Sequence, residues 1–359
     1  MKAGFLKRPM KVNMNMYPQI DSMIDDFFRK QAGRWADLPK GVTGRREVFR
    51  AGNMKLFKFD SPAEVEGRTP MLFVPSLINR WYILDLTEET SLVKPVAEKF
   101  PTYMIDWGYP GCEASHLPFE HFYKRALNRI VKFICRESGH EKINMLGYCI
   151  GGTLSYLYSC IEPERVNKVI LLASPINFED GGISGLYAKN FPTEQFLESM
   201  ESMPGGKIAE FFNNIQPFGV IKKMQMFQKK HQDEGFVKMF VAMERWIADD
   251  GVNFPAKAYY DFIGDFYGKN KLAKNELTLS DGTAIDAARR TAECLILNAT
   301  ADHIVPVPAT ALPAADAAPR ETLTYNTGHI GITVGKYGAE VRKNVINFLN
   351  KGEEGVANV

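Results

Sequence analysis

Short apolar runs alternate with longer amphipathic stretches along most of this chain. The apolar runs lie at residues 54–59, 71–77, 102–107, 143–148, 169–173, 294–299 and 322–325. Most of them are nearly continuous in apolar residues, as is typical of parallel strands that are buried on both faces. Stretches with helical spacing lie between them, notably at residues 120–136, 152–162 and 339–350. This alternation predicts an α/β fold with a mostly parallel central sheet and helices on both faces.

The alternation is interrupted within residues 177–287, where there is no strand pattern and the sequence is rich in Phe, Met, Tyr and Gly. We therefore expect residues 51–176 and 288–359 to form the α/β core and residues 177–287 to form a large cap, or lid. Open α/β sheets bind ligands at the carboxyl edge of their strands, so the cap is expected to cover that edge. Residues 1–50 are expected to form an N-terminal segment that is partly helical, because residues 20–28 carry apolar side chains at helical spacing.

The composition narrows the class of protein. The chain has 359 residues, of which 45% are hydrophobic, so it can form a large packed core and intrinsic disorder is excluded. Its 44 basic and 42 acidic residues leave a net charge of +2, which gives no reason to expect a nucleic-acid partner. Five cysteines without a metal-type spacing argue against a disulfide framework or a metal site and favour a reducing, intracellular compartment. No stretch reaches the roughly 18 apolar residues of a membrane span, so we expect no integral membrane segment. The start is basic, but residues 12–22 are polar where an export signal has its apolar core, so we expect no export signal.

The main chemical signal is the pentapeptide Gly147-Tyr148-Cys149-Ile150-Gly151, which follows an expected strand and opens an expected helix. It is the nucleophile-elbow pattern G-x-S-x-G with cysteine in place of serine. The tight strand-to-helix turn leaves little space beside the nucleophile, which accounts for the glycines on both sides. The pattern predicts Cys149 as a nucleophile and the backbone N–H of Ile150 as one oxyanion donor. The alternative is a small buried residue in a glycine-rich turn.

An acid and a histidine follow the cysteine in the chain order that such a site requires. Asp302 and His329 each lie just past an expected strand, and the carboxyl ends of parallel strands meet at one edge of the sheet. His303 competes with His329 for the role of base. We prefer His329, because Asp302 takes the place of the acid and His303 is its immediate neighbour. The second oxyanion donor is expected in the loop after residues 71–77, where the backbone N–H of Ile78 is the best candidate.

A cysteine nucleophile suits acyl transfer better than hydrolysis. A thiolate that attacks an acyl thioester exchanges one thioester for another at almost no free-energy cost, and the acyl-cysteine stays activated toward an alcohol. This chemistry fits the transfer of an acyl group from a coenzyme A thioester onto a hydroxyl. A cap that limits water would suppress the competing hydrolysis. Cys160 and Cys294 follow no chemical pattern and are expected to be packing residues.

Eight further segments, taken together and in order, carry a family resemblance. They are NRWYILDL (79–86), DWGYPG (106–111), LGYCIGGT (146–153), ASPINF (173–178), ERWIAD (244–249), DFY (265–267), DHIVP (302–306) and GHIG (328–331). With them the sequence resembles the catalytic subunit of polyhydroxyalkanoate synthases, members of the α/β-hydrolase superfamily, over about residues 45–350. The resemblance implies that Cys149 carries an acyl group or the growing chain as a thioester and that His329 activates its thiol. It implies that Asp302 orients His329 or helps to activate the 3-hydroxyl of the next unit.

The resemblance also implies a subtype and its partners. Only about 50 residues precede the core, so the chain is similar to the short synthases that work with a small accessory subunit. The segments DWG and GHIG resemble the class III pattern, whereas GYCIGG and residues 253–272 look closer to class IV. Short acyl units are implied, chiefly 3-hydroxybutyryl-CoA, with release of coenzyme A and no separate cofactor. The other partners implied are the growing polyester chain, the surface of cytoplasmic polyester granules and a second copy of this chain in a homodimer.

Two other functions are compatible with the sequence. One is a hydrolase on the same fold, either a thioesterase or a depolymerase of the same polyester, because a fold alone does not determine the reaction. The cysteine argues against it, since most esterases on this fold use serine. The other is a non-catalytic granule-associated protein. The intact order of nucleophile, acid and histidine argues against that function.

Overall fold

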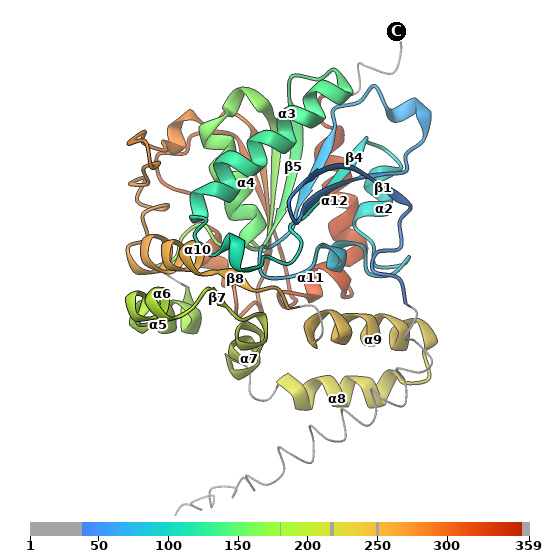
Figure 1. The fold of residues 1–359 in the computed structure, drawn as a ribbon. Coiled ribbons are helices and arrows are strands. Elements are labelled where there is room, and N and C mark those ends of the chain that lie inside the picture. Colours follow the sequence, from blue (N-terminus) through green and yellow to red (C-terminus); the bar gives the residue numbers. More distant parts are fainter. Residues whose placement is uncertain (1–37, 180, 216–218, 249–250, 354–359) are drawn as a thin grey trace, which may run out of the picture. The chain divides into compact units, whose positions relative to one another are not determined.

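One mixed sheet forms the centre of the computed structural model, which describes residues 38–179, 181–215, 219–248 and 251–353 (Figure 1). Its strands are β1 (Arg45–Ala51), β2 (Met54–Phe59), β3 (Met71–Val74), β4 (Thr102–Asp106), β5 (Ile143–Tyr148), β6 (Val166–Leu172), β9 (Glu293–Ala299) and β10 (Arg320–Tyr325). The spatial order is β1-β2-β4-β3-β5-β6-β9-β10. β2 pairs antiparallel with both β1 and β4, whereas all pairs from β4 to β10 are parallel.

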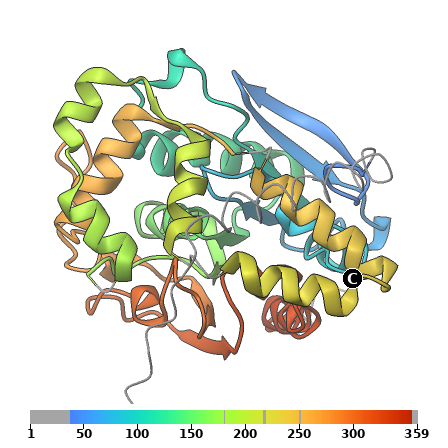
Figure 2. The same cartoon turned by 90° about the horizontal axis from the view of Figure 1, so that it is seen from below.

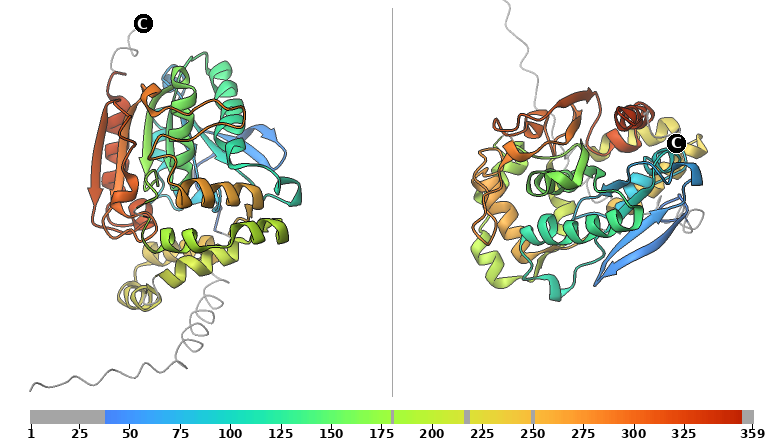
Figure 3. Two further views of the ribbon diagram at one scale, coloured as in Figure 1. Left: turned by 90° about the vertical axis from the view of Figure 1, so that its left-hand side faces the viewer. Right: turned by 90° about the horizontal axis from the view of Figure 1, so that it is seen from above.

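Helices cover both faces of this sheet. The α-helices of the core are α2 (Val93–Ala97), α3 (Leu127–Ser138), α4 (Ile150–Ile161), α11 (Gly331–Val334) and α12 (Gly338–Asn350). In Figures 1 and 3, α3 and α4 lie on one face and α2 and α12 on the other. Because both faces are covered, β3, β4 and β5 are buried along their whole length and need no polar side.

Short turns complete the core. A π-helical turn, η4 (His121–Ala126), leads directly into α3. The 3₁₀ turns are η1 (Ala63–Val65), η2 (Trp81–Asp85), η3 (Cys112–Ala114), η5 (Pro163–Arg165), η7 (Ala287–Arg289) and η8 (Val307–Thr310). Of these, η2 follows the loop after β3 and is buried throughout, so it fixes the end of that loop against the core.

Between β6 and β9 the chain leaves the sheet and forms a layer of helices at the carboxyl ends of the strands (Figure 2). Its helices are α5 (Gly182–Asn190), α6 (Thr193–Ser199), α7 (Gly205–Ile215), α8 (Gly219–Lys230), α9 (Glu234–Ala248), α10 (Ala256–Asp261) and the π-helical η6 (Phe262–Gly268). Two short strands, β7 (Ser202–Met203) and β8 (Phe254–Pro255), pair within it. We call residues 177–287 the cap. Phe119 of the core packs against the rings of Phe262 and Phe266, at centroid distances of 5.0 and 5.1 Å, and so holds η6 on the core.

The α/β architecture with a mostly parallel sheet is confirmed, and several strands have the expected bounds. The strands predicted at residues 54–59 and 143–148 are β2 and β5. The strand predicted at residues 71–77 ends earlier, at Val74, because Pro75 has no N–H with which to continue the ladder. The helix predicted at residues 152–162 begins two residues earlier as α4.

Two predictions about strands were wrong. Residues 45–50, assigned to the N-terminal segment, form most of β1, an edge strand whose four charged side chains interrupt the apolar pattern. The cap contains the β7–β8 pair, although no strand was expected there. The helical spacing at residues 20–28 lies outside the described residues. Among the described residues, no helix is long and apolar enough to cross a membrane.

Candidate active site

Cys149 lies at the turn between β5 and α4 in a strained backbone conformation. Its φ is 54° and its ψ is −127°, a region that a residue with a side chain rarely adopts. The turn is held by the backbone N–H of Cys149, which donates to the carbonyl of Leu172 on β6 at 3.0 Å. The side chain is 7% exposed and lies at the carboxyl edge of the sheet. Such strain at a buried cysteine is typical of a nucleophile elbow.

Steric crowding explains the two glycines that flank Cys149. A Cβ atom at Gly151 would overlap the carbonyl oxygen of Val74 and lie 2.7 Å from that of Pro75. A Cβ atom at Gly147 would overlap the backbone of Gly151 on the opposite side of the turn. Because backbone atoms cannot move aside as a flexible side chain can, each position requires glycine. The spacing in the sequence therefore predicted this turn for the correct physical reason.

Asp302 and His329 meet in a short, buried hydrogen bond. The Nδ1 atom of His329 lies 2.6 Å from Oδ2 of Asp302, and the two side chains are 11% and 0% exposed. The other carboxylate oxygen, Oδ1, accepts the backbone N–H groups of Ile304 and Val305, both at 2.8 Å. Both oxygens of the acid are thus occupied, and the ring of His329 has one preferred orientation.

The charge on His329 is set by its neighbours. Burial opposes the charged form of the ring, but the negative charges of Asp302 and Cys149, with hydrogen bonds to both, raise its pKa to about 10. The ring therefore carries a proton at neutral pH. Tyr148 adds support, since its ring packs 5.2 Å from that of His329 and its hydroxyl donates to the backbone carbonyl of His329 at 3.3 Å.

The competing histidine has a different environment. His303 is exposed, although it lines a cavity together with His329. The imidazole ring that the structure places in hydrogen-bond contact with Asp302 is that of His329. The structure therefore brings together Cys149, Asp302 and His329, as the chain order predicted.

The two expected oxyanion donors flank the cysteine. Ile150 is the first residue of α4, where a backbone N–H has no acceptor within the helix. Ile78 lines the same cavities as Cys149, and its N–H makes a long contact of 3.5 Å with Oγ of Ser76. The carbonyl of Ile78 accepts the N–H of Val252 from the cap at 3.2 Å, so the cap helps to fix this loop.

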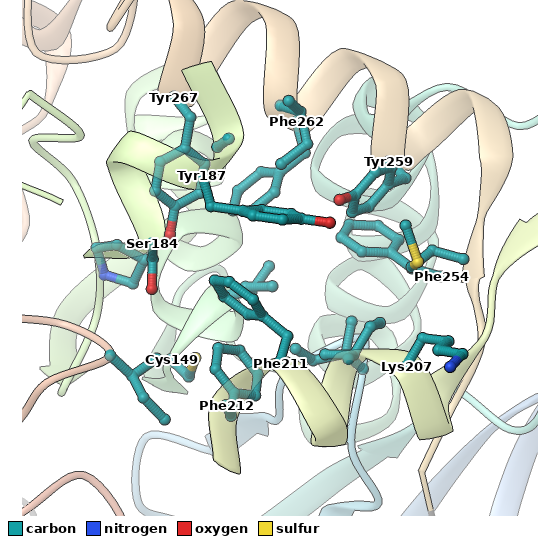
Figure 4. A pocket seen from close by; sticks show the side chains of 18 of the residues that line it. Cys149, Ser184, Tyr187, Lys207, Phe211, Phe212, Phe254, Tyr259, Phe262 and Tyr267 are labelled. Atoms are coloured by element: carbon teal, nitrogen blue, oxygen red, sulfur yellow. The ribbon is translucent and has the colours of Figure 1, made fainter. Parts of the chain in front are cut away.

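Two cavities meet at Cys149. The first has a volume of about 340 Å³ and is lined mostly by apolar side chains, and its aromatic side chains all come from the cap (Figure 4). Those labelled are Tyr187, Phe211, Phe212, Phe254, Tyr259, Phe262 and Tyr267. The second has a volume of about 350 Å³ and is the one that His329 lines. We call them the aromatic cavity and the histidine cavity.

Some contacts of the site have no local pattern in the sequence. The indole N–H of Trp246 on α9 donates to the carbonyl of Arg80 at 2.8 Å, a contact between residues far apart in the chain. The aromatic residues of the cap were noted in the sequence, but their density alone does not separate a cavity wall from the packing of the cap itself.

Burial raises the pKa of the Cys160 and Cys294 thiols to about 12, so both are unreactive packing residues as expected. Among the described residues, no group of three or more His, Cys, Asp or Glu side chains could hold a metal ion.

Two family descriptions match the sequence. The α/β hydrolase fold matches residues 69–335. The N-terminus of poly-beta-hydroxybutyrate polymerase (PhaC) matches residues 41–96. The first match includes the elbow, the acid and the histidine, and the second includes the loop that holds Ile78.

Relatives and solved structures agree with these matches. The poly(3-hydroxyalkanoate) polymerase subunit PhaC of Thiocystis violacea is 31% identical over 88% of this chain and 90% of its own length. The subunit of the same name from Haloferax mediterranei is 32% identical over 83% of this chain, which spans only 62% of that relative. A monoacylglycerol lipase from Paleococcus ferrophilus has the same fold, with a TM-score of 0.52, 16% identity and coverage of 83% of this chain and 98% of its own.

Proposed function

Because this chain belongs to the poly(3-hydroxyalkanoate) polymerase subunit PhaC family and has the α/β hydrolase fold, we propose that it is a polyester synthase. In this proposal it transfers short 3-hydroxyacyl groups, chiefly 3-hydroxybutyryl, from coenzyme A to the hydroxyl end of a growing chain. The observation that carries the proposal is the position of Cys149 between a charged His329–Asp302 pair and an aromatic cavity. Coenzyme A enters as part of the substrate and leaves as a product, so no separate cofactor is required.

The first step is the acylation of Cys149. The thiolate attacks the thioester carbonyl, and a new C–S bond forms while the carbonyl oxygen becomes an oxyanion. The N–H groups of Ile150 and Ile78 are the proposed donors to that oxyanion. The tetrahedral intermediate collapses as the bond to the sulfur of coenzyme A breaks. His329 gives its proton to the departing thiolate, so coenzyme A leaves as a free thiol.

The second step forms the ester. Neutral His329 accepts the proton of a 3-hydroxyl group, and the oxygen attacks the acyl carbon on Cys149. The C–S bond breaks, the ester is released, and the thiolate and imidazolium are restored. Since His329 lines the histidine cavity, we assign the attacking hydroxyl to that cavity. The aromatic cavity is then left for the acyl group on Cys149, and its volume is at the lower end of the range of about 300–1,000 Å³ for small-molecule sites.

The contacts of Asp302 favour one of its two possible roles. One carboxylate oxygen binds the His329 ring and the other accepts two backbone N–H groups. An acid with both oxygens occupied is suited to hold the imidazole and to stabilise its charge. Activation of the 3-hydroxyl then falls to His329 alone.

The proposal extends to the partners of the chain. We infer that a small accessory subunit, or a second copy of this chain, favours a form in which the cap is open to the coenzyme A thioester. A partner can shift the cap only by binding the open form better than the closed one. We further propose that the elongating chain keeps the enzyme at the surface of a polyester granule in the cytoplasm.

The test is to follow 3-hydroxybutyryl-CoA and to identify the products. A synthase releases coenzyme A and accumulates insoluble polymer, whereas a thioesterase releases coenzyme A and free 3-hydroxybutyrate. The variant Cys149→Ala should abolish both products, and Cys149→Ser should be nearly as inactive because an alkoxide is much harder to generate. The exposed Cys112 provides a matched control, and Cys112→Ala should remain active. Free acid as the main product, or polymer from Cys149→Ala, would overturn the proposal.

A further inference from the structure

Ser184 carries a buried hydroxyl group and lies in the wall of the aromatic cavity. The residue is 5% exposed and lines this cavity together with Cys149. Among the residues that the structure describes, its Oγ atom has no hydrogen-bond partner. A buried hydroxyl without a partner is unfavourable, so such a group in a cavity wall indicates a polar ligand that completes it.

The surroundings of Ser184 bring it close to the reacting atoms. Ser184 lies in the first turn of α5, and Tyr267 packs against that turn: a Cβ atom at Gly181 would lie 3.1 Å from Cε1 of Tyr267. The pKa of the Tyr267 hydroxyl is raised by burial and by the negative charges of Cys149 and Asp302, so it stays protonated. In Figure 4 the hydroxyl ends of Ser184 and Tyr267 both point toward the part of the cavity that holds Cys149.

The rest of the cavity wall is poor in groups that could replace Ser184. Most of its side chains are aromatic or aliphatic. Lys207 pairs with Glu210 at 2.9 Å, and both side chains are more than half exposed, so they lie at the solvent side. Asn214 and Tyr187 also line the cavity, but both are exposed, so the buried hydroxyl without a partner at the α5 turn is the group left to pair with a polar atom of the acyl group.

We propose that the Ser184 hydroxyl hydrogen-bonds the oxygen on the third carbon of the acyl group carried by Cys149. This inference rests on the proposed synthase function. It makes the first turn of α5 the subsite that distinguishes a 3-hydroxyacyl group from a plain acyl group. A site built to pair with a substrate oxygen rejects the analogue that lacks it, because its own polar group then stays unpaired.

The experiment compares acylation of Cys149 by 3-hydroxybutyryl-CoA and by butyryl-CoA, which differs only in lacking that oxygen. The readouts are the first-turnover release of coenzyme A and the mass added to the enzyme. The wild type should prefer 3-hydroxybutyryl-CoA, and Ser184→Ala should lose about five- to tenfold of that preference, the size expected for one hydrogen bond. Ser184→Thr keeps a hydroxyl and should retain most of the preference.

Stability measurements separate this role from a structural one. Since Ser184 makes no hydrogen bond in the described part of the chain, Ser184→Ala should not lower the melting temperature. The matched control is Ser159→Ala, because Ser159 is also buried but its hydroxyl donates to the carbonyl of Tyr156 at 2.7 Å. That control should lower the melting temperature and leave the preference intact.

The outcomes also distinguish the inference from its premise. If neither thioester acylates the wild-type enzyme, the proposed function fails. If the wild type is acylated but Ser184→Ala keeps the full preference, the synthase proposal stands and the role of Ser184 is wrong. Loss of the preference only in Ser184→Ala supports the subsite.

Discussion

The side chains of His329 and Asp302 form a short hydrogen bond, in which Nδ1 of His329 lies 2.6 Å from Oδ2 of Asp302. Because the second carboxylate oxygen is held by the backbone of Ile304 and Val305, the acid cannot turn away from the ring without losing two further hydrogen bonds. This arrangement gives His329 one orientation and a stable positive charge. His303, the sequence neighbour of Asp302, also lines the histidine cavity, but its side chain is exposed.

The first prediction concerns which histidine acts as the base. His329→Gln should lower the rate of polymer formation by about 10²- to 10⁴-fold, the range for loss of a general base. His303→Gln should change it by less than about tenfold, because the side chain is exposed and Asp302 pairs with His329. Initial rates of coenzyme A release from 3-hydroxybutyryl-CoA measure both variants. The reverse ranking would make His303 the base.

The second prediction concerns stability and pH. The pKa of a histidine in an unfolded chain is about 6.5, and that of His329 in the folded protein is about 10. A raised pKa means that the folded state binds the proton more tightly, so its stabilising contribution is complete below about pH 6.5 and disappears as the pH rises toward 10. The free energy of unfolding of the wild type should therefore exceed that of His329→Gln most near pH 6. Urea unfolding of both proteins from pH 6 to pH 10 measures the margin, and a constant margin would contradict the charge coupling.

The third prediction concerns the elbow. Gly151→Ala places a methyl group against the backbone carbonyls of Val74 and Pro75, which belong to the strand and loop that carry the second oxyanion donor. We expect a loss of about 1–3 kcal/mol in the free energy of unfolding, as for other overpacked sites, and nearly complete loss of activity. Gly67→Ala is the matched control, because a Cβ atom there meets nothing within 4 Å. Equal effects of the two substitutions would show that crowding at the elbow is not decisive.

The fourth prediction concerns the contact between Lys168 and the end of α12. The ammonium of Lys168, buried on β6, donates to the backbone carbonyls of Phe348 and Leu349 at 2.9 and 3.1 Å, and also to that of Lys351. Lys168→Met would keep the packing volume but remove the ammonium donor from these carbonyls at the end of α12, and that of Phe348 would keep a contact of 3.3 Å with the N–H of Lys351. We expect it to lower the free energy of unfolding by about 1–3 kcal/mol, the cost of leaving buried acceptors unpaired, with little change in the turnover of correctly folded enzyme. The exposed Lys336 offers a control, since Lys336→Met removes a charge without removing such contacts. Equal stability of both variants would contradict the role of Lys168.

Local sterics and strand order made the catalytic part of this site predictable. The elbow is a property of five consecutive residues, so the glycines around Cys149 identify it without knowledge of distant contacts. Asp302 and His329 could be predicted because each follows a strand of a parallel sheet and such strand ends meet at one edge. Strand β1 was missed because an edge strand with charged side chains has no continuous apolar run.

The remaining parts of the site depend on tertiary contacts that leave no local pattern. Ser184 is one serine in a glycine-rich stretch, and the sequence does not show that its hydroxyl is buried without a partner in the wall of a cavity. Tyr267 reaches the cavity through the π-helical turn η6, an irregularity that side-chain periodicity does not encode. The hydrogen bond from Trp246 to the carbonyl of Arg80 joins the cap to the loop after β3, and no spacing in the sequence predicts it.

The last prediction concerns the attachment of the cap beside Cys149. Besides the indole of Trp246 on the carbonyl of Arg80, the N–H of Val252 donates to the carbonyl of Ile78 at 3.2 Å. These contacts hold the cap on the loop after β3, whose Ile78 lines the same cavities as Cys149, and Cys149 is only 7% exposed. A bulky maleimide should therefore alkylate Cys149 much more slowly than iodoacetamide does, with the alkylated residue identified by mass spectrometry.

Loosening this attachment should open the way to the thiol. Trp246→Phe keeps most of the ring but removes the N–H, so the bulky reagent should react about five- to tenfold faster, as for the loss of one hydrogen bond, while iodoacetamide changes little. Trp107→Phe is the matched control, because the indole N–H of Trp107 donates to Pro75 in the same loop at 3.0 Å but comes from the core. The accessory subunit, added without the substrate that would acylate Cys149, should accelerate the bulky reagent in the wild type by favouring the open form. If the isolated chain is fully active and the bulky reagent reacts equally fast in all these proteins and conditions, the cap is a static lid.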